Sequence, residues 1–271
     1  MIKAGSAGSN PDNATTFQSP AFQIFLNCVG KSVANINTIA VGLDAVENGY
    51  QKPKGLNISW KPQDRQSAAR QARRFAIESA LLRVSESYYE YCQAITALPN
   101  VKTANDESEK ANKVRKIALD VLPANEQNFL IEAVCLLIHW RNRIVHPKSK
   151  ASLTKAQQRT LLAEEELIAS EYANLSIKRL LEDFDSKKPT LKDVSSLISM
   201  TINLAKKIDH HMVPSNREGV EAWLNHYNMG PKINKVIRES SPSKKEDSVR
   251  RLIRTELPQL EEAYFKFLWK S

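Results

Sequence analysis

The chain has 271 residues, of which 42% are hydrophobic and 25% charged, a balance typical of a globular protein. Lysine and arginine number 39 against 30 aspartate and glutamate residues, which gives a formal net charge of +9. A basic surface attracts polyanions such as RNA or DNA, although the same charge also serves solubility alone. The sequence contains no uninterrupted run of about 18 apolar residues, so we expect no membrane-spanning segment.

The three cysteines lie far apart in the sequence, and no pair has the C-x-x-C spacing of a redox or zinc site. Cys28, Cys92 and Cys135 each fall in an apolar stretch with helical periodicity. Buried, reduced thiols are typical of a cytoplasmic protein, whereas secreted proteins favour disulfides. We therefore expect a cytoplasmic protein without disulfides.

The first patterned segment follows residues 1–20, which we expect to be a flexible tail. From Phe22 to Leu43 apolar residues recur at three- and four-residue steps, which predicts a helix that ends at Asn48-Gly49. Residues 50–63 contain two prolines and a glycine and are typical of a loop. No convincing pair of strands appears, so the chain is predicted to be all-α. Further helices are expected at residues 64–98, 105–122, 125–146, 154–185, 190–209 and 216–228, followed by helical pieces toward the C-terminus.

The best candidate for a domain boundary is Lys187-Lys188-Pro189. Beyond it, Thr190-x-x-Asp193 and Ser215-x-x-Glu218 have the spacing of capping boxes and predict two helix starts. We expect residues 21–186 to form one helical bundle and residues 187–271 to form a C-terminal helical region whose role the sequence does not indicate.

The most apolar stretch, FLIEAVCLLI, is followed directly by HWRNRIVHP, residues 139–147. In a helix, Arg141, Asn142 and His146 extend the buried face rather than the solvent face. Burying Arg141 without a partner is costly, so it must meet an anion, a cleft or another subunit. Pro147 disfavours helical geometry at His146, so the helix should end there, where its dipole favours a protonated imidazole.

Arg141, Asn142 and His146 resemble the signature of the HEPN superfamily, in which an arginine is followed by a polar residue and, about three residues later, by a histidine. The resemblance implies a HEPN-like helical bundle over residues 21–186 with a C-terminal helical extension. It also implies a metal-independent endoribonuclease that uses no cofactor and works as a homodimer, with two copies of the motif facing one cleft. Such proteins recur in toxin–antitoxin and antiviral systems, so the resemblance implies RNA as substrate and a cognate antitoxin or a defence complex as a further partner.

The chemistry of RNA cleavage suits these side chains. Without a metal, the reaction needs a base for the 2′-hydroxyl proton, an acid for the leaving 5′-oxygen and a cation for the phosphorane. Arg141 is expected to bind phosphate oxygens and His146 to transfer a proton, with one histidine of a dimer as base and its mate as acid. Asn142 is expected to orient the imidazole or bind the ribose, and Arg143 to contact the RNA backbone.

A second set of basic residues lies on the helix predicted at residues 64–98. Arg70, Arg73 and Arg74 are spaced i, i+3 and i+4, so they share one helix face. We interpret this face as a further RNA contact, and the alternative is an ordinary solvated helix face.

Two alternatives to the ribonuclease stay open. In both, Arg141 is only the partner of a carboxylate such as Glu78 or Glu132 inside the bundle. The domain would then be a catalytically inactive module that binds nucleic acid or protein, or the silent nuclease subunit of a defence complex.

Other histidines give weaker signals. His139 is close enough in sequence to reach the same cleft, but packing in a core or interface is the more ordinary role. Asp209-His210-His211 suggests metal ligands, but no third ligand stands at a useful spacing, so we expect no metal site.

Overall fold

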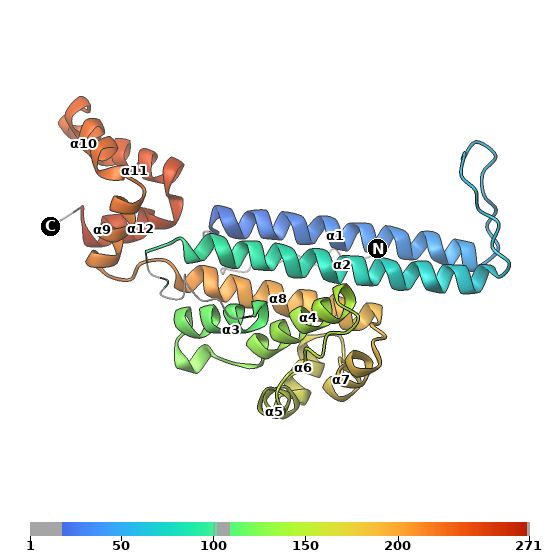
Figure 1. Cartoon of the computed structure of the whole chain (residues 1–271). Helices are drawn as coiled ribbons and strands as arrows, with labels where there is room; N and C mark the ends of the chain where they lie inside the picture. The colour runs from blue at the N-terminus through green and yellow to red at the C-terminus, as the bar shows by residue number, and fades with distance from the viewer. Residues whose placement is uncertain (1–17, 100, 102–108, 270–271) are drawn as a thin grey trace, which may run out of the picture.

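The computed structural model describes residues 18–99, 101 and 109–269, and within these ranges it contains helices and no strand. The all-α prediction is therefore confirmed for the described part of the chain (Figure 1). Most of the tail expected at residues 1–20, namely residues 1–17, lies outside the described residues. The α-helices are α1 Pro20–Glu47, α2 Arg65–Thr96, α3 Lys110–Val121, α4 Phe129–Val145, α5 Lys155–Ala163, α6 Glu165–Glu171, α7 Ile177–Ser186, α8 Leu191–His211, α9 Arg217–His226, α10 Met229–Glu239, α11 Lys245–Glu256 and α12 Glu261–Phe267.

Helices α1 and α2 form a long antiparallel hairpin along one side of the molecule (Figure 1). Each begins at a side-chain cap, because Ser19 accepts a hydrogen bond from the Phe22 amide and Asp64 accepts one from the Gln66 amide. Their bounds agree with the helices predicted from residue 22 and over 64–98. Close to the N-terminus of α1 the two helices are joined by packed aromatic rings: Phe22, Phe25, Tyr88 and Tyr91.

Helix α4 is the centre of the first core. Every residue from Phe129 to Trp140 is buried, as expected for a helix that is apolar nearly all round. Helix α4 packs against α2, α3, α5 and α8, so it has neighbours from four other helices of the bundle.

The segment predicted as one helix over residues 154–185 is three helices, so that prediction is wrong. Helix α5 ends at Ala163, and α6 is separated from α7 by a turn in which Ala173 and Asn174 adopt left-handed backbone angles, with φ of 53° and 55°. The two breaks between these helices allow Ile168, Tyr172 and Ile177 all to lie in the core. In one straight helix, some of these side chains would point away from the core.

The division between the cores also differs from the expected boundary at residues 187–189. Helix α8 lies beyond that boundary, yet its apolar face belongs to the first core, which extends to Met212. A second core begins at Val220 and joins α9 to α12, a lobe that Figure 1 shows apart from the bundle. The capping box of Thr190 and Asp193 is confirmed, whereas α9 is capped by Asn216 rather than by Ser215.

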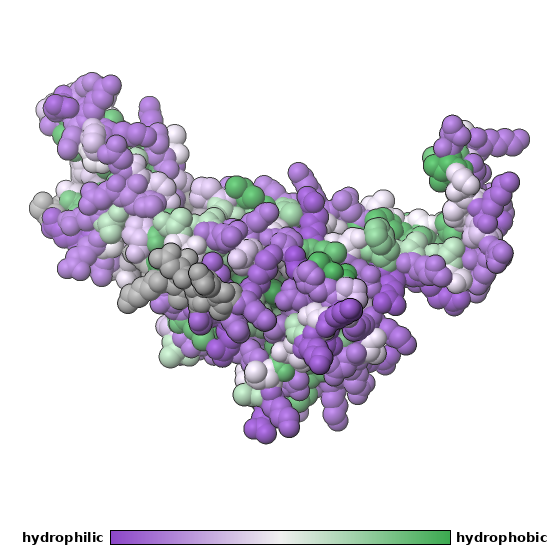
Figure 2. All heavy atoms as spheres, in the orientation of Figure 1, coloured by the Kyte–Doolittle hydropathy of each residue, from purple (hydrophilic) through white to green (hydrophobic). Residues whose placement is uncertain are grey.

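Helix α1 is long and apolar enough to cross a membrane by length and composition, and no other described helix passes that test. In this fold α1 lies along α2 and gives Phe22, Phe25, Val29 and Ile36 to the core. Its outer side is left exposed, and green, hydrophobic side chains appear at several places along the hairpin in Figure 2.

Candidate active site

The motif is placed by the end of α4. The helix ends at Val145, and His146 is its C-cap, with an extended backbone (φ −121°, ψ 90°) and an amide that donates to the Asn142 carbonyl. This confirms the helix end predicted from Pro147. The His146 side chain is exposed to solvent, whereas Arg141 and Asn142 are partly buried.

Arg141 meets a carboxylate, but not one of the two expected. Its Nε donates to Oε1 of Glu86 on α2 at 2.6 Å, and its Nη1 donates to Oδ1 of Asn142 at 3.2 Å. Glu78 and Glu132 are instead paired with Arg74 and Arg115. The ion pair explains how a side chain that is only 17% exposed keeps its charge.

Glu86 is shared between two cations. Nζ of Lys110, at the start of α3, lies 3.1 and 2.9 Å from the two carboxylate oxygens of Glu86. Partial burial acts to raise the pKa of Glu86, but the hydrogen bond from Lys110 and the charges of Arg141 and Lys110 outweigh it, so the pKa lies below its ordinary value. Two cations against one anion leave a local positive charge beside the motif.

The three motif residues line one open groove with a volume of about 650 Å³. The structure thus brings together Arg141, Asn142 and His146, as the sequence predicted. The groove also holds residues that sequence reasoning did not choose. The complete lining is Glu109, Lys110, His139, Arg141, Asn142, His146, Ser149, Lys150, Ala151 and Ser152.

His139 is the least expected member of the groove. It is 7% exposed, and its Nδ1 is buried without a hydrogen-bond partner. Burial lowers the pKa of His139, the Arg143 charge lowers it further, and Glu109 opposes both. The sequence contained a signal for it, because the spacing of His139, Asn142 and His146 (i, i+3, i+7) places all three on one helix face.

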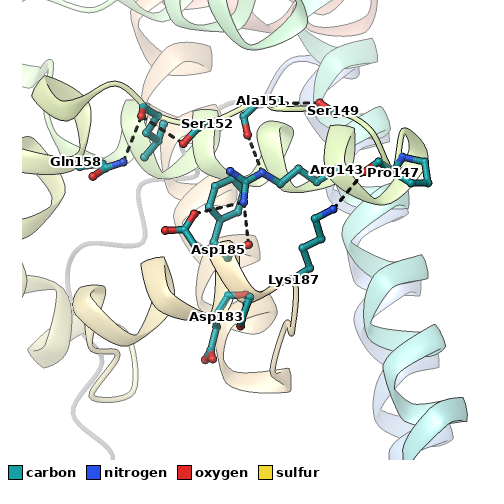
Figure 3. A network of polar contacts seen from close by, with 12 residues as sticks. Arg143, Pro147, Ser149, Ala151, Ser152, Gln158, Asp183, Asp185 and Lys187 are labelled. Carbon is teal, nitrogen blue, oxygen red and sulfur yellow. Dashed lines mark hydrogen bonds and ion pairs between the residues drawn. The ribbon is translucent and has the colours of Figure 1, made fainter.

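Arg143 does not line the groove, and its side chain is engaged in contacts within the chain, so its expected contact with the RNA backbone stays a prediction. Its Nε donates to the Ala151 carbonyl at 2.7 Å and its Nη1 to the Phe184 carbonyl at 3.1 Å (Figure 3). The guanidinium carbon lies 3.7 Å from the centre of the Phe184 ring, and an ion pair to Asp185 completes the site. A side chain only 12% exposed is therefore used to hold the loop after α4 against α7.

Lys187 holds the same loop from the other side. Its Nζ donates to the Pro147 carbonyl at 3.2 Å (Figure 3). The carbonyl of Lys187 accepts a hydrogen bond from Nη2 of Arg74 on α2. The residues after His146 are thus tied to α7 and to α2, which fixes the position of His146 at the rim of the groove.

The three arginines of α2 line a second groove, of about 710 Å³, between the hairpin and residues 188–191. Their common face is confirmed. Arg73 is paired with Glu47 at 3.3 Å and Arg74 with Glu78 at 2.8 Å, while Arg70 is exposed and has no ion pair among the described residues. The two grooves share no lining residue, and the contact from Arg74 through Lys187 to Pro147 connects them.

The Asp209-His210-His211 segment does not converge on one point. The Asp209 carboxylate accepts hydrogen bonds from the amide and hydroxyl of Ser19, and His211 Nε2 lies 2.7 Å from Glu126 Oε1. Across the described ranges, no group of three or more His, Cys, Asp or Glu side chains is arranged to hold a metal ion.

No protein family, curated protein or solved structure matches this chain. The site is therefore interpreted from its own geometry and from the motif.

Proposed function

We propose that this protein is a HEPN-like, metal-independent endoribonuclease. The observation that carries the proposal is that Arg141, Asn142 and His146 line one solvent-open groove beside an excess of positive charge. A groove with a fixed guanidinium and an accessible imidazole offers the two groups that metal-free cleavage of RNA needs most.

In the proposed reaction the 2′-hydroxyl oxygen of a ribose attacks the adjacent phosphorus. The bond from phosphorus to the 5′-oxygen breaks, which leaves a 2′,3′-cyclic phosphate and a 5′-hydroxyl. Arg141 stabilises the charge that develops on the phosphorane oxygens, and His146 transfers a proton. Asn142, which accepts a hydrogen bond from Arg141, orients the guanidinium, and its NH2 group, which has no hydrogen-bond partner within the described part of the chain, binds the ribose.

A homodimer is part of the proposal, with the two grooves opening into one cleft. Its support is exposed apolar surface: Val145, next to His146, is 42% exposed, and Ile24 and Val41 on α1 are 68% and 73% exposed. Light scattering at micromolar concentration should give about twice the chain mass of 30.6 kDa, and a monomer at every concentration contradicts the shared cleft.

The second candidate is a catalytically inactive module that binds nucleic acid or a partner protein, such as an antitoxin or a subunit of a defence complex. The ion pair between Arg141 and Glu86 favours this second candidate, because the Arg141 guanidinium must give up the Glu86 carboxylate before it can bind a phosphate.

The experiment that separates the two is an RNA-cleavage assay in EDTA with His146→Ala and Arg141→Ala. Each variant should lose about two to four orders of magnitude in rate. The fold should survive His146→Ala, because the side chain is exposed. His210→Ala is the matched control, since His210 is also exposed but lies outside the groove.

The products should carry a 2′,3′-cyclic phosphate and a 5′-hydroxyl. If the wild type binds RNA but does not cut it, or if both variants cut at the wild-type rate, the binding module replaces the ribonuclease.

A further inference from the structure

The groove holds two histidines of one chain, and only one belongs to the motif. His139 on α4 and His146 at the C-cap of α4 both line it, seven residues apart in the sequence, with Asn142 between them on the same face. Seven residues correspond to two helical turns, a rise of about 10 Å. The two imidazoles therefore border one open space from positions two turns apart.

His139 is not explained by packing alone. It is 7% exposed, and its Nδ1 is closed off from solvent with no hydrogen-bond partner among the described residues. A buried polar atom without a partner costs about 1–3 kcal/mol, and an apolar side chain at this position would avoid that cost. A catalytic role is one of the reasons for which such a group is retained.

Burial of His139 favours its neutral form. Its charged or titratable neighbours along the chain are Arg141 and Arg143 on α4 and His146 at the C-cap of α4. The groove adds Glu109 and Lys110 from the start of α3 and Lys150 from the loop after α4. Burial is the largest influence and lowers the pKa of His139, Arg143 acts in the same direction, and Glu109 opposes them. An imidazole that is unprotonated at neutral pH is ready to accept a proton.

We propose that His139 is the general base of this site and that His146 of the same chain is the general acid. The inference rests on the proposed ribonuclease function and assigns its second proton-transfer group. His139 accepts the proton of the 2′-hydroxyl as the oxygen–phosphorus bond forms. His146, which is exposed and is reprotonated from solvent, donates a proton to the 5′-oxygen as its bond to phosphorus breaks.

One consequence concerns the dimer. If both groups come from one chain, each chain holds a complete catalytic set, and the second proton does not require the His146 of a partner subunit. The assignment differs in this respect from a site shared by two copies of His146.

The roles of base and acid are separable with a modified substrate. Four homopolymeric oligoribonucleotides, one for each base, are prepared with and without a sulfur in place of one bridging 5′-oxygen. A thiolate leaves without protonation, so His146→Ala should regain most of its lost rate on the sulfur substrate. His139→Ala should stay about 10²- to 10⁴-fold slow on both, because its 2′-hydroxyl still needs a base.

Two further readouts distinguish catalysis from structure. In the wild type the acid limb of the pH profile of kcat/KM should follow the titration of His139, and in His139→Ala that limb should disappear. Added imidazole should restore part of the rate of His139→Ala. Cys135→Ala is the control for a buried change one turn earlier on α4, and His139→Gln, which keeps a polar side chain, serves if His139→Ala does not fold.

A mixed dimer tests the single-chain assignment. A wild-type chain paired with a chain carrying both His139→Ala and His146→Ala should keep about half of the activity, and a far larger loss overturns the assignment. An active monomer supports it.

Failure of this inference is distinguishable from failure of the proposed function. If His139→Ala, folded as judged by circular dichroism, cuts at the wild-type rate while His146→Ala does not, the inference is overturned and the ribonuclease stands. If the sulfur substrate restores the rate of His139→Ala and not that of His146→Ala, the assignment of His139 as base and His146 as acid is wrong. If the wild type cuts neither substrate, the proposed ribonuclease function is itself overturned.

Discussion

Arg141 on α4 and Glu86 on α2 are joined by a 2.6 Å hydrogen bond between Nε and Oε1, although 55 positions separate them in the sequence. Lys110 on α3 binds the same carboxylate, so one anion orders cations from two helices at the edge of the groove. Glu86 therefore has two opposing effects: it positions Arg141, and it competes with a phosphate for it.

Glu86→Gln should strengthen RNA binding, because Arg141 and Lys110 lose the carboxylate that neutralises them. The salt dependence of binding should become steeper by about one unit of slope, measured by fluorescence anisotropy over a range of salt concentrations. Glu221→Gln, which removes the partner of Arg217 in the C-terminal lobe, is the control and should leave the slope unchanged. Equal behaviour of the two variants would mean that RNA does not reach Arg141.

Arg143→Ala should destabilise the fold by about 2 kcal/mol in urea unfolding, because two partly buried carbonyls lose their charged donor. Arg143→Lys should not restore stability, since an ammonium group cannot reproduce the planar fork over Phe184. Arg179→Ala, at an exposed position on α7, should stay within about 0.5 kcal/mol. Wild-type stability of Arg143→Ala would show that the loop does not depend on this contact.

Replacing Arg70, Arg73 and Arg74 together by alanine should weaken RNA binding and flatten its salt dependence by about three units of slope at most. Arg70→Ala alone should have the largest single effect, because Arg73 and Arg74 already have carboxylate partners. The charge-matched control replaces three exposed cations of the C-terminal lobe: Lys235, Arg238 and Arg251. An unchanged slope in the first variant would assign these arginines to ordinary surface.

His139 should make stability depend on pH. Because its pKa in the folded protein lies below the ordinary value of 6.5, the unfolded chain binds more protons than the folded chain between those two values. The free energy of unfolding should therefore be highest above about pH 6.5 and should fall as the pH drops toward the folded pKa. His139→Gln should lose this part of the pH dependence in urea titrations, whereas His210→Gln should keep it.

The helices themselves follow from local sequence. The periodicity of apolar residues predicted α1, α2 and α4, and Pro147 predicted where α4 ends, because these signals act over a few residues. The same locality predicted that Arg141, Asn142 and His146 lie together at the end of a buried helix. The helix prediction failed over residues 154–185. The apolar pattern there is helical, but it does not show that the chain must turn twice to keep its apolar side chains in the core.

The tertiary structure decided the partners of the charged side chains. Glu86, rather than Glu78 or Glu132, is the partner of Arg141, and Arg143 packs against Phe184. Both contacts join helices that are distant in sequence, and no local sequence pattern shows which of these helices lie side by side. Packing also placed α8 in the first core, beyond the Lys187-Lys188-Pro189 break. Sequence thus determined most of the helices and which face of them is apolar, since backbone hydrogen bonding and side-chain period are local. Which carboxylate pairs with which cation depends on how the helix faces pack against one another, and only the tertiary structure decides that packing.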